Sequence, residues 1–339
     1  MPISLSVLDQ SPISAGSDAS TALANSVELV QLAERLGYRR YWVAEHHATS
    51  GLAGSAPEIL IAHLAARTST IRVGSGGVML PHYSPFKVAE QFRVLEALYP
   101  GRIDLGVGRA PGGGQLSAVA LQRNREQPVI DDFPRQIVEL FTWLGDSFPD
   151  RHPFSKITAT PVTAGEPAPW VLSSSGYGAA VAAQLGTGFC FADFINPEGG
   201  AGAVAHYLAT YAPSRFMAAP QASVAVSVIC ARSDEEAERL AAPLGLWRRR
   251  LHRGDPGPIP SVEDALAELA AGDKPELSPR RRRLVLGAPD RVADELKALA
   301  GAYGVEEIVV VTITHDHADR LRSYELLADA FGLDGPEPG

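Results

Sequence analysis

The chain has 339 residues, 45% of them hydrophobic and 20% charged, which is enough to bury a substantial core without disulfide staples. Its formal net charge of −9 argues against a general affinity for nucleic acid, and its two cysteines cannot form a disulfide framework. No apolar run is long enough to cross a membrane and no export signal opens the sequence, so we expect a cytoplasmic protein.

Short apolar runs alternate with amphipathic segments along almost the whole chain. Eight runs have the length and composition of strands: residues 3–8, 41–45, 71–80, 102–108, 169–174, 188–194, 223–231 and 306–314. Helical patterns lie between them, and the first of these, residues 20–36, is expected to have a serine cap and to end at Gly37.

Eight strands that alternate with helices predict an α/β fold, a (β/α)8 TIM barrel, as a single domain over residues 1–339. An open doubly wound sheet is the competing arrangement. It would normally show a glycine-rich phosphate loop after the first strand, and LDQSPISAGS is not such a loop.

Two stretches exceed what a barrel needs. Residues 145–168, rich in proline and threonine, predict a short excursion before the fifth strand. Residues 232–285 form an insertion after the seventh strand, and an insertion there lies on the catalytic face of a barrel. A lid over the site and a solvated surface segment are both open interpretations of this insertion.

Functional side chains of such barrels stand at the carboxyl ends of the strands. The second strand ends in AEHH (44–47), where neighbouring histidines point to opposite sides of an extended chain. We therefore expect one histidine in the barrel mouth, as an acid, base or hydrogen-bond donor, and the other in its wall. The glycines of SGG (75–77) would let the backbone approach a flat ligand closely, although a strand bulge would use them equally well.

A second candidate site lies between the fifth strand and the following helix. SSSGYGA (173–179) presents hydroxyls and free N–H groups at a helix N-terminus, which favours a phosphate, although serine capping alone gives much the same sequence. Arg109, at the end of the fourth strand, is a candidate to pair with such a phosphate. The nearby GVGRAPGGGQ lacks the Gly-Lys-Ser/Thr ending and the glycine spacing of a nucleotide loop.

HDH (315–317) has the residue types of a metal site, which would suit a metal-dependent hydrolase. We favour instead the first turn of the last helix, where the acid would stabilise the positive end of the helix dipole, and we predict no metal. The G-x-S-x-G elbow of a serine hydrolase does not occur in the sequence.

The stretch RYWVAEHHATSGLAGSAPEILIAHLAARTSTIRVGSGGVMLPHYSPFKVAEQFRVLEALYPGRIDLGVGRAPG (40–112) resembles the luciferase-like flavin monooxygenase family. The resemblance continues in WVLSSSGYGAAVAAQLGTGFCFADFIN (170–196) and in LVLGAPDRVADELKALAGAYGVEEIVVV (284–311). Within the family, the chain most resembles single-chain actinobacterial members that tailor aromatic polyketides, as in antibiotic biosynthesis.

The resemblance implies reduced FMN as the cofactor and assigns roles residue by residue. His46 falls on the histidine that acts beside the flavin, and Gly76–Gly77 falls where a non-proline cis peptide supports the flavin ring. The residues expected around the FMN phosphate are Arg109, Arg123, Ser174, Ser175, Tyr177 and Gly178, with Arg125 an equal alternative to Arg123. The substrate side is expected to include Asp9, Glu45 and Asp193.

We therefore predict a two-component, FMN-dependent monooxygenase that uses O2 to hydroxylate, epoxidise or Baeyer–Villiger oxidise an organic molecule. The chain has no second dinucleotide domain, so reduced FMN would come from a separate NAD(P)H:FMN reductase. The resemblance also suggests a homodimer through the helices near the second and third strands. The alternatives are a deazaflavin-dependent oxidoreductase of the same superfamily and a flavin-binding protein without catalysis.

Overall fold

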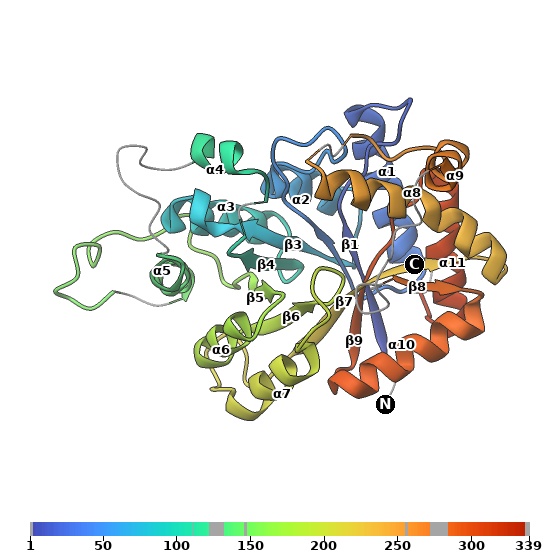
Figure 1. Cartoon of the computed structure of the whole chain (residues 1–339). Coiled ribbons are helices and arrows are strands. Elements are labelled where there is room, and N and C mark those ends of the chain that lie inside the picture. The colour runs from blue at the N-terminus through green and yellow to red at the C-terminus, as the bar shows by residue number, and fades with distance from the viewer. Residues whose placement is uncertain are drawn as a thin grey trace.

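The computed structural model describes residues 3–110, 112–121, 132–145, 148–254, 257–271 and 284–335. At its centre is a closed barrel of eight parallel strands, in which pairing of β6 with β7 completes the ring (Figure 1). The barrel strands are β1 (Ser4–Asp9), β2 (Arg40–Val43), β3 (Arg72–Met79), β4 (Ile103–Gly108), β5 (Ala168–Ser173), β6 (Gly188–Ala192), β7 (Ala222–Cys230) and β9 (Glu307–Val311). The predicted (β/α)8 barrel is confirmed.

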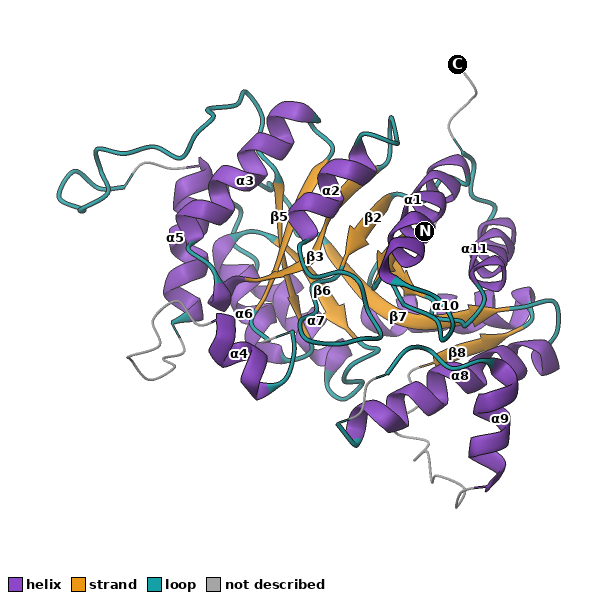
Figure 2. Ribbon diagram, turned by 90° about the horizontal axis from the view of Figure 1, so that it is seen from above, coloured by secondary structure: helices purple, strands orange, loops and turns teal. Residues whose placement is uncertain are grey.

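Eleven α-helices lie around the strands in the described part of the chain (Figure 2). They are α1 (Ala19–Arg35), α2 (Pro57–Ala65), α3 (Pro85–Leu98), α4 (Gln115–Leu121), α5 (Phe133–Gly145), α6 (Gly176–Leu185), α7 (Gly200–Thr210), α8 (Asp234–His252), α9 (Val262–Ala271), α10 (Pro289–Tyr303) and α11 (His317–Phe331). None of these helices is long and apolar enough to cross a membrane.

Local sequence sets the ends of α1. Asp18, rather than the predicted serine, is the N-cap, and its carboxylate accepts a hydrogen bond from the Thr21 N–H at 2.8 Å. Aspartate serves as well as serine at this position because its oxygen satisfies one of the helix's free N–H groups. Gly37 ends the helix, as predicted, with a φ of +82° that glycine adopts without steric cost.

Alternation of side chains along the strands builds two hydrophobic cores. The outer core lies under the helices and includes Leu5, Val7, Tyr41, Val43, Phe189, Phe191, Val226 and Val228. The inner core fills the barrel and includes Leu8, Trp42, Ala44, Trp170, Cys190, Ala225, Ile229 and Val309. The same alternation decides which side chains beyond the strand ends reach the barrel mouth.

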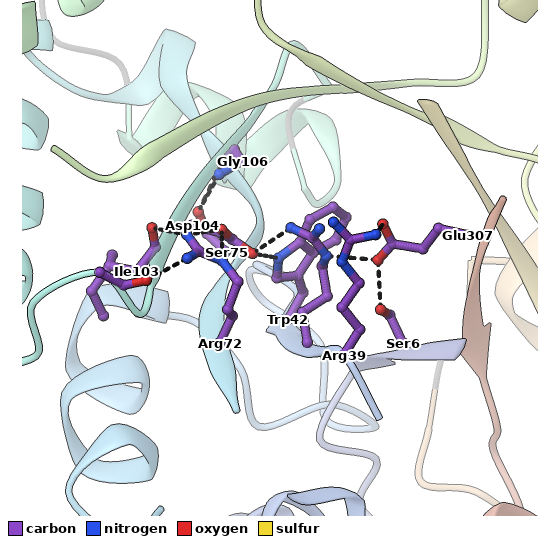
Figure 3. Close-up of polar contacts among 11 residues, drawn as sticks. Ser6, Arg39, Trp42, Arg72, Ser75, Ile103, Asp104, Gly106 and Glu307 are labelled. Atoms are coloured by element: carbon purple, nitrogen blue, oxygen red, sulfur yellow. Dashed lines mark hydrogen bonds and ion pairs between the residues drawn. The ribbon is translucent and has the colours of Figure 1, made fainter. Parts of the chain in front are cut away.

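Charged side chains close the amino-terminal end of the barrel (Figure 3). Buried Asp104 accepts hydrogen bonds from Arg40 at 2.9 Å and from Arg72 at 2.6 Å, and Arg40 also lies 2.6 Å from Glu307. Burial alone would raise the pKa of Asp104, but Arg40 and Arg72 hold it below its usual value. The Arg40 guanidinium also lies 4.5 Å from the centre of the Trp170 ring. The opposite end of the barrel, where the strands terminate, is therefore the end at which a ligand site is expected.

The insertion after β7 contains α8 and α9 and runs into a ninth strand, β8 (Leu284–Gly287). This strand pairs in parallel with the carboxyl half of β7, from Ser227 to Cys230. The sequence does not predict β8, because three apolar residues followed by a glycine are at the lower limit of strand length and have no clear alternation. Leu240, Leu244 and Trp247 of α8 belong to the inner core, so the helix packs against the carboxyl end of the barrel.

Candidate active site

The two histidines after β2 point to opposite sides, as predicted. His46 lies on the same side of the chain as Trp42 and Ala44, which belong to the inner core. His47 lies on the other side, with its Nε2 atom 2.6 Å from Glu45 Oε1. His46 thus continues the inward-facing side of β2, and His47 continues the outward-facing side.

The His46 ring is enclosed and only partly bonded. Its Nδ1 atom is buried and has no hydrogen-bond partner among the described residues. Burial, and secondarily the neighbouring His47, lower the pKa of His46 to about 4, so the ring is neutral at physiological pH. A neutral imidazole accepts a hydrogen bond at one ring nitrogen and donates one from the other.

Glu45 joins the ends of β2 and β3. Its side chain has no exposed surface, and it accepts hydrogen bonds from the Tyr83 hydroxyl at 2.6 Å and from the Met79 N–H at 2.9 Å, in addition to its contact with His47. Burial and the Glu45 carboxylate raise the pKa of Tyr83 well above its usual value. Glu45 therefore fixes the backbone around the site and presents no surface to a substrate.

The Gly76–Gly77 peptide in β3 is cis, as the family resemblance implies. A Cβ atom on Gly76 would lie 2.5 Å from the Leu8 side chain, and one on Gly77 would lie 2.7 Å from the Gly106 carbonyl oxygen. Neither position accepts a side chain, because both contacts are far shorter than van der Waals distance. Two residues without side chains thus stand together near the carboxyl end of β3.

The turn from β5 into α6 exposes the N-terminus of that helix. Ser175 is the N-cap residue, but its side chain makes no capping hydrogen bond. The Ser173 hydroxyl accepts a hydrogen bond from the Ser175 N–H at 3.2 Å, and Asn196 Nδ2 donates to the Ser174 carbonyl at 3.1 Å. A Cβ atom on Gly178 would collide with the Ser173 side chain, which explains the glycine. The first N–H groups of α6 and the serine hydroxyls can therefore receive an anion.

Arg109, from the end of β4, lies beside this turn. Its guanidinium carbon is 5.1 Å from the centre of the Tyr177 ring, and both side chains are exposed. The structure thus brings together Arg109, Tyr177 and the serine turn that the sequence singled out. Arg123 and Arg125, the candidates for a second phosphate arginine, lie outside the described residues.

The three acids expected on the substrate side are all fully buried: Asp9, Glu45 and Asp193. Asp9 follows Leu5 and Val7 on the outer side of β1, and its carboxylate accepts hydrogen bonds from Arg320 and from the Tyr41 hydroxyl, each at 2.6 Å. Asp9 therefore holds β1 against α11 and does not line the mouth. This corrects the expectation for Asp9, and the reason is the alternation of side chains along an extended chain.

HDH (315–317) forms the N-terminus of the last helix, α11. Asp316 is the N-cap of α11, with its carboxylate accepting a hydrogen bond from the Ala318 N–H at 2.9 Å. His315 Nδ1 lies 3.1 Å from the Ile259 carbonyl oxygen, and His317 Nε2 lies 3.4 Å from Glu28. The three side chains thus have separate partners, which agrees with the helix-terminus interpretation.

Sequence reasoning missed two residues near the mouth, Tyr83 and Arg248. Tyr83 is the first tyrosine after β3, which is a signal that the sequence contains. Its partner Glu45 follows a different strand, β2, so the contact between the two cannot be read from the sequence. Arg248 lies on α8 and reaches Ser227 on β7, a contact that only the folded chain reveals. The run WRRRLH gives no means of telling which of its three arginines turns inward.

Comparison with known proteins places this geometry in a family. The model of the luciferase-like monooxygenase family matches residues 3–306. N-acetyl-S-alkylcysteine monooxygenase of Bacillus subtilis (strain 168) is 41% identical, with 97% of this chain and 98% of the relative covered. The crystal structure of apo-MsnO8 has a TM-score of 0.90 at 44% identity, with 99% of both chains covered.

More distant structures share the fold alone. The oxygenating constituent of 3,6-diketocamphane monooxygenase from Pseudomonas putida, solved with FMN, is 20% identical over 99% of both chains, with a TM-score of 0.68. An F420-dependent secondary alcohol dehydrogenase, solved with an F420–acetone adduct, is 14% identical over 98% of this chain and 99% of the other, with a TM-score of 0.70. Flavin-type cofactors, FMN in some and F420 in others, thus accompany this fold. With a family match over most of its length and relatives named as monooxygenases, the chain is an enzyme that belongs to the luciferase-like monooxygenase family.

Proposed function

We propose that the protein is a two-component monooxygenase that binds reduced FMN at the carboxyl end of the barrel and uses O2 to oxygenate a small organic molecule. The observation that carries the proposal is the fit of the site to two parts of FMN, its phosphate and its ring. The open N-terminus of α6 with Arg109 suits a phosphate, and the Gly76–Gly77 peptide suits a flat ring.

The FMN phosphate would be held by Ser174, Ser175, Tyr177, Arg109 and the N–H groups around Gly178. A dianion at this place gains from the partial positive charge of the helix N-terminus and from a charge-assisted hydrogen bond to the guanidinium. An arginine after β4, Arg123 or Arg125, would supply a second cation. When bound, reduced FMN supplies the electrons that activate O2 for insertion into the substrate.

His46 would act at its Nε2 atom, because Nδ1 is buried and has no surface at which a ligand could bind. Because the ring is neutral, it would accept a proton from the substrate or hold a hydrogen bond to the cofactor without adding charge to the pocket. The inner-core side chains that fill the barrel, among them Trp42 and Leu52, would exclude water from the interior beneath the site. We further propose that the 232–285 insertion shapes the substrate side and acts as a lid. Asp193, which has no exposed surface, would support this side from within the protein.

For the substrate, an aromatic polyketide of secondary metabolism is the proposal that the family resemblance favours. The relative named N-acetyl-S-alkylcysteine monooxygenase makes organic thioethers the second class to test. We propose a cytoplasmic enzyme that receives reduced FMN by diffusion from a separate NAD(P)H:FMN reductase.

We propose that the enzyme is a homodimer through α2 and α3. Apolar side chains are exposed on both helices, including Ile59 at 69% and Leu98 at 59% exposure. Ile59 lines two grooves, one of about 560 Å³ beside α1 and one of about 440 Å³ beside α3. Because a contiguous apolar surface on a helix pair is costly in water, a second copy of the same face is the occupant we expect.

An anaerobic titration tests the cofactor proposal. Reduced FMN, oxidised FMN and the deazaflavin F420 would be added separately to the protein and binding followed by absorbance and fluorescence. We expect reduced FMN to bind and, after O2 is admitted, oxygen consumption to follow product formation. Binding of F420 with no binding of FMN would contradict the proposal and make the protein an oxygen-independent oxidoreductase.

A further inference from the structure

Arg248 on α8 holds a positive charge at the barrel mouth without a carboxylate partner. Its Nη2 atom donates a hydrogen bond to the Ser227 hydroxyl at 2.7 Å. Within the described residues no Asp or Glu lies within ion-pair distance of Arg248, and Ser227 is the one hydrogen-bond acceptor of its guanidinium. The other guanidinium nitrogens are neither bonded nor buried within this part of the chain, so they are open to a ligand.

The position of Ser227 shows that the guanidinium turns toward the barrel interior. Ser227 alternates along β7 with Ala225 and Ile229, which belong to the inner core. It also pairs with Val311, the last residue of β9, and so lies at the carboxyl rim of the barrel. Arg248 therefore reaches the end of the barrel at which the candidate active site lies.

Two fully buried arginines of this protein have carboxylate partners. Arg40 lies between two carboxylates, and Arg320 pairs with Asp9 at 2.6 Å. The half-buried Arg93 donates instead to three backbone carbonyls, those of Trp143, Leu144 and Pro161.

The guanidinium of Arg248 has neither a carboxylate partner nor a set of backbone carbonyl acceptors among the described residues. Burial lowers its pKa, and its neighbours Leu244 and Trp247 on α8 are apolar members of the inner core. The guanidinium is half-buried, and the one neutral acceptor, Ser227, replaces only part of the hydration that it has lost.

We propose that Arg248, oriented by Ser227, binds a carboxylate of the substrate. The planar guanidinium fork matches the two oxygens of a carboxylate, and one unpaired cation matches one negative charge. The site differs from the phosphate site at α6, because it is built from α8 and β7. The inference rests on the proposed function, since the substrate would lie with its carboxylate on Arg248 and its reacting atom toward His46.

Direct binding tests this assignment without turnover. Isothermal titration calorimetry would compare 4-phenylbutanoate and octanoate with their primary amides, and with octane-1-sulfonate, on the enzyme with and without FMN. We expect a carboxylate to bind about 10- to 100-fold more tightly than its amide, because a hydrogen-bonded charge pair at a desolvated site is lost in the amide. Equal binding of carboxylate and amide, no binding of either carboxylate, or tighter binding of the sulfonate would overturn the proposal.

Substitutions of Arg248 test whether this residue causes the preference for a carboxylate over its amide. Arg248→Gln should remove the preference for carboxylate over amide, whereas Arg248→Lys should keep a smaller preference because lysine retains the charge without the fork. Arg239→Gln is the matched control, since Arg239 is on the same helix but pairs with Glu263 at 3.1 Å. A preference that survives in Arg248→Gln would contradict the assignment. Reduced FMN should bind Arg248→Gln as it binds the wild type, so a failure of flavin binding in the wild type would count against the proposed function alone.

Discussion

The Arg109 guanidinium lies 5.1 Å from the centre of the Tyr177 ring, although one residue follows β4 and the other opens α6. A cation over an aromatic face is held in place without losing its charge. The contact therefore holds Arg109 beside the first turn of α6.

Arg109→Ala should weaken binding of reduced FMN by about tenfold or more, because a charge-assisted hydrogen bond to phosphate is removed. The loss should be smaller at high salt, where the wild-type attraction is screened. Anaerobic fluorescence titration at two ionic strengths measures both effects. Arg135→Ala, at an arginine on α5 whose side chain is 81% exposed, is the control and should bind as the wild type. Unchanged affinity in Arg109→Ala would sink the phosphate assignment.

His46 gives the protein a stability that depends on pH. Its pKa is about 4 in the folded chain and near 6.5 when unfolded, so the unfolded state binds more protons between these values and stability falls as pH drops from 6.5 to 4. The full effect is roughly 3 kcal/mol. His46→Gln should lose this dependence, so it should gain about 2 kcal/mol relative to the wild type between pH 7 and pH 5. Urea unfolding at the two pH values measures the difference, and parallel curves for the two proteins would refute the prediction.

The same substitution should lower turnover at saturating reduced FMN, if His46 acts in the reaction as proposed. Glutamine keeps a hydrogen-bonding side chain of similar length but cannot exchange a proton near neutral pH. Steady-state assays should show a fall in kcat with little change in flavin affinity. Full product yield from His46→Gln would exclude a catalytic role for the residue.

Glu45→Gln should destabilise the fold by about 2 to 3 kcal/mol, because a buried acceptor of three hydrogen bonds is replaced by a group with only one acceptor oxygen. Tyr83→Phe removes only one of those bonds and should cost about 1 kcal/mol. The two changes should not add, since they share a hydrogen bond, and a double-mutant cycle in urea measures the coupling. Additive losses would show that Glu45 and Tyr83 act independently.

Gly176 and Gly178 lie in the same turn, so substitutions at the two positions can be compared as a test of the phosphate site. Gly178→Ala should distort the turn, because the new Cβ atom would collide with Ser173. We expect a loss of about 1 to 3 kcal/mol in stability and weaker FMN binding. Gly176→Ala meets nothing within 4 Å and should be neutral or slightly stabilising. Similar behaviour of the two variants would mean that the turn tolerates a side chain at Gly178 and does not position the phosphate.

The proposed dimer can be broken at α2. Ile59→Asp places a charge where two grooves meet and should give a monomer in light scattering, because an unpaired carboxylate at an apolar interface is strongly disfavoured. Leu208→Asp, at a partly exposed position on α7, should leave the oligomer unchanged. A monomeric wild type, or a dimer that survives Ile59→Asp, would require another interface or none.

Much of this architecture can be predicted from the sequence because it depends on short-range patterns. Continuous apolar runs indicate strands buried on both faces, and eight of them between helices are enough for the barrel. The same alternation distinguishes His46 from His47 once Trp42 is known to face inward. The glycines at 76 and 77 and the turn at 173–179 also lie at strand ends, where a barrel places its site.

What the sequence did not predict depends on partners far along the chain. Asp9 and Arg320 are 311 residues apart, so a strand-end acid could not be recognised as half of a buried ion pair. Arg248 contacts Ser227 and has no carboxylate beside it among the described residues, and neither fact can be predicted from the sequence. Polar groups in a core take their role from what surrounds them, and that information is tertiary.

The sealed floor of the barrel, with Arg40 between Asp104 and Glu307, has a consequence for the order of events. In the proposed enzyme, cofactor, substrate and product would all pass through the carboxyl end of the barrel, so the component that lies deepest would have to bind first and leave last. With the flavin ring against β3 and the substrate nearer to α8, loading would be compulsory in sequence: flavin, then substrate, with product released before spent flavin. Binding and release would then follow a fixed order, and the oxidised flavin would have to leave after each turnover before another reduced flavin could bind.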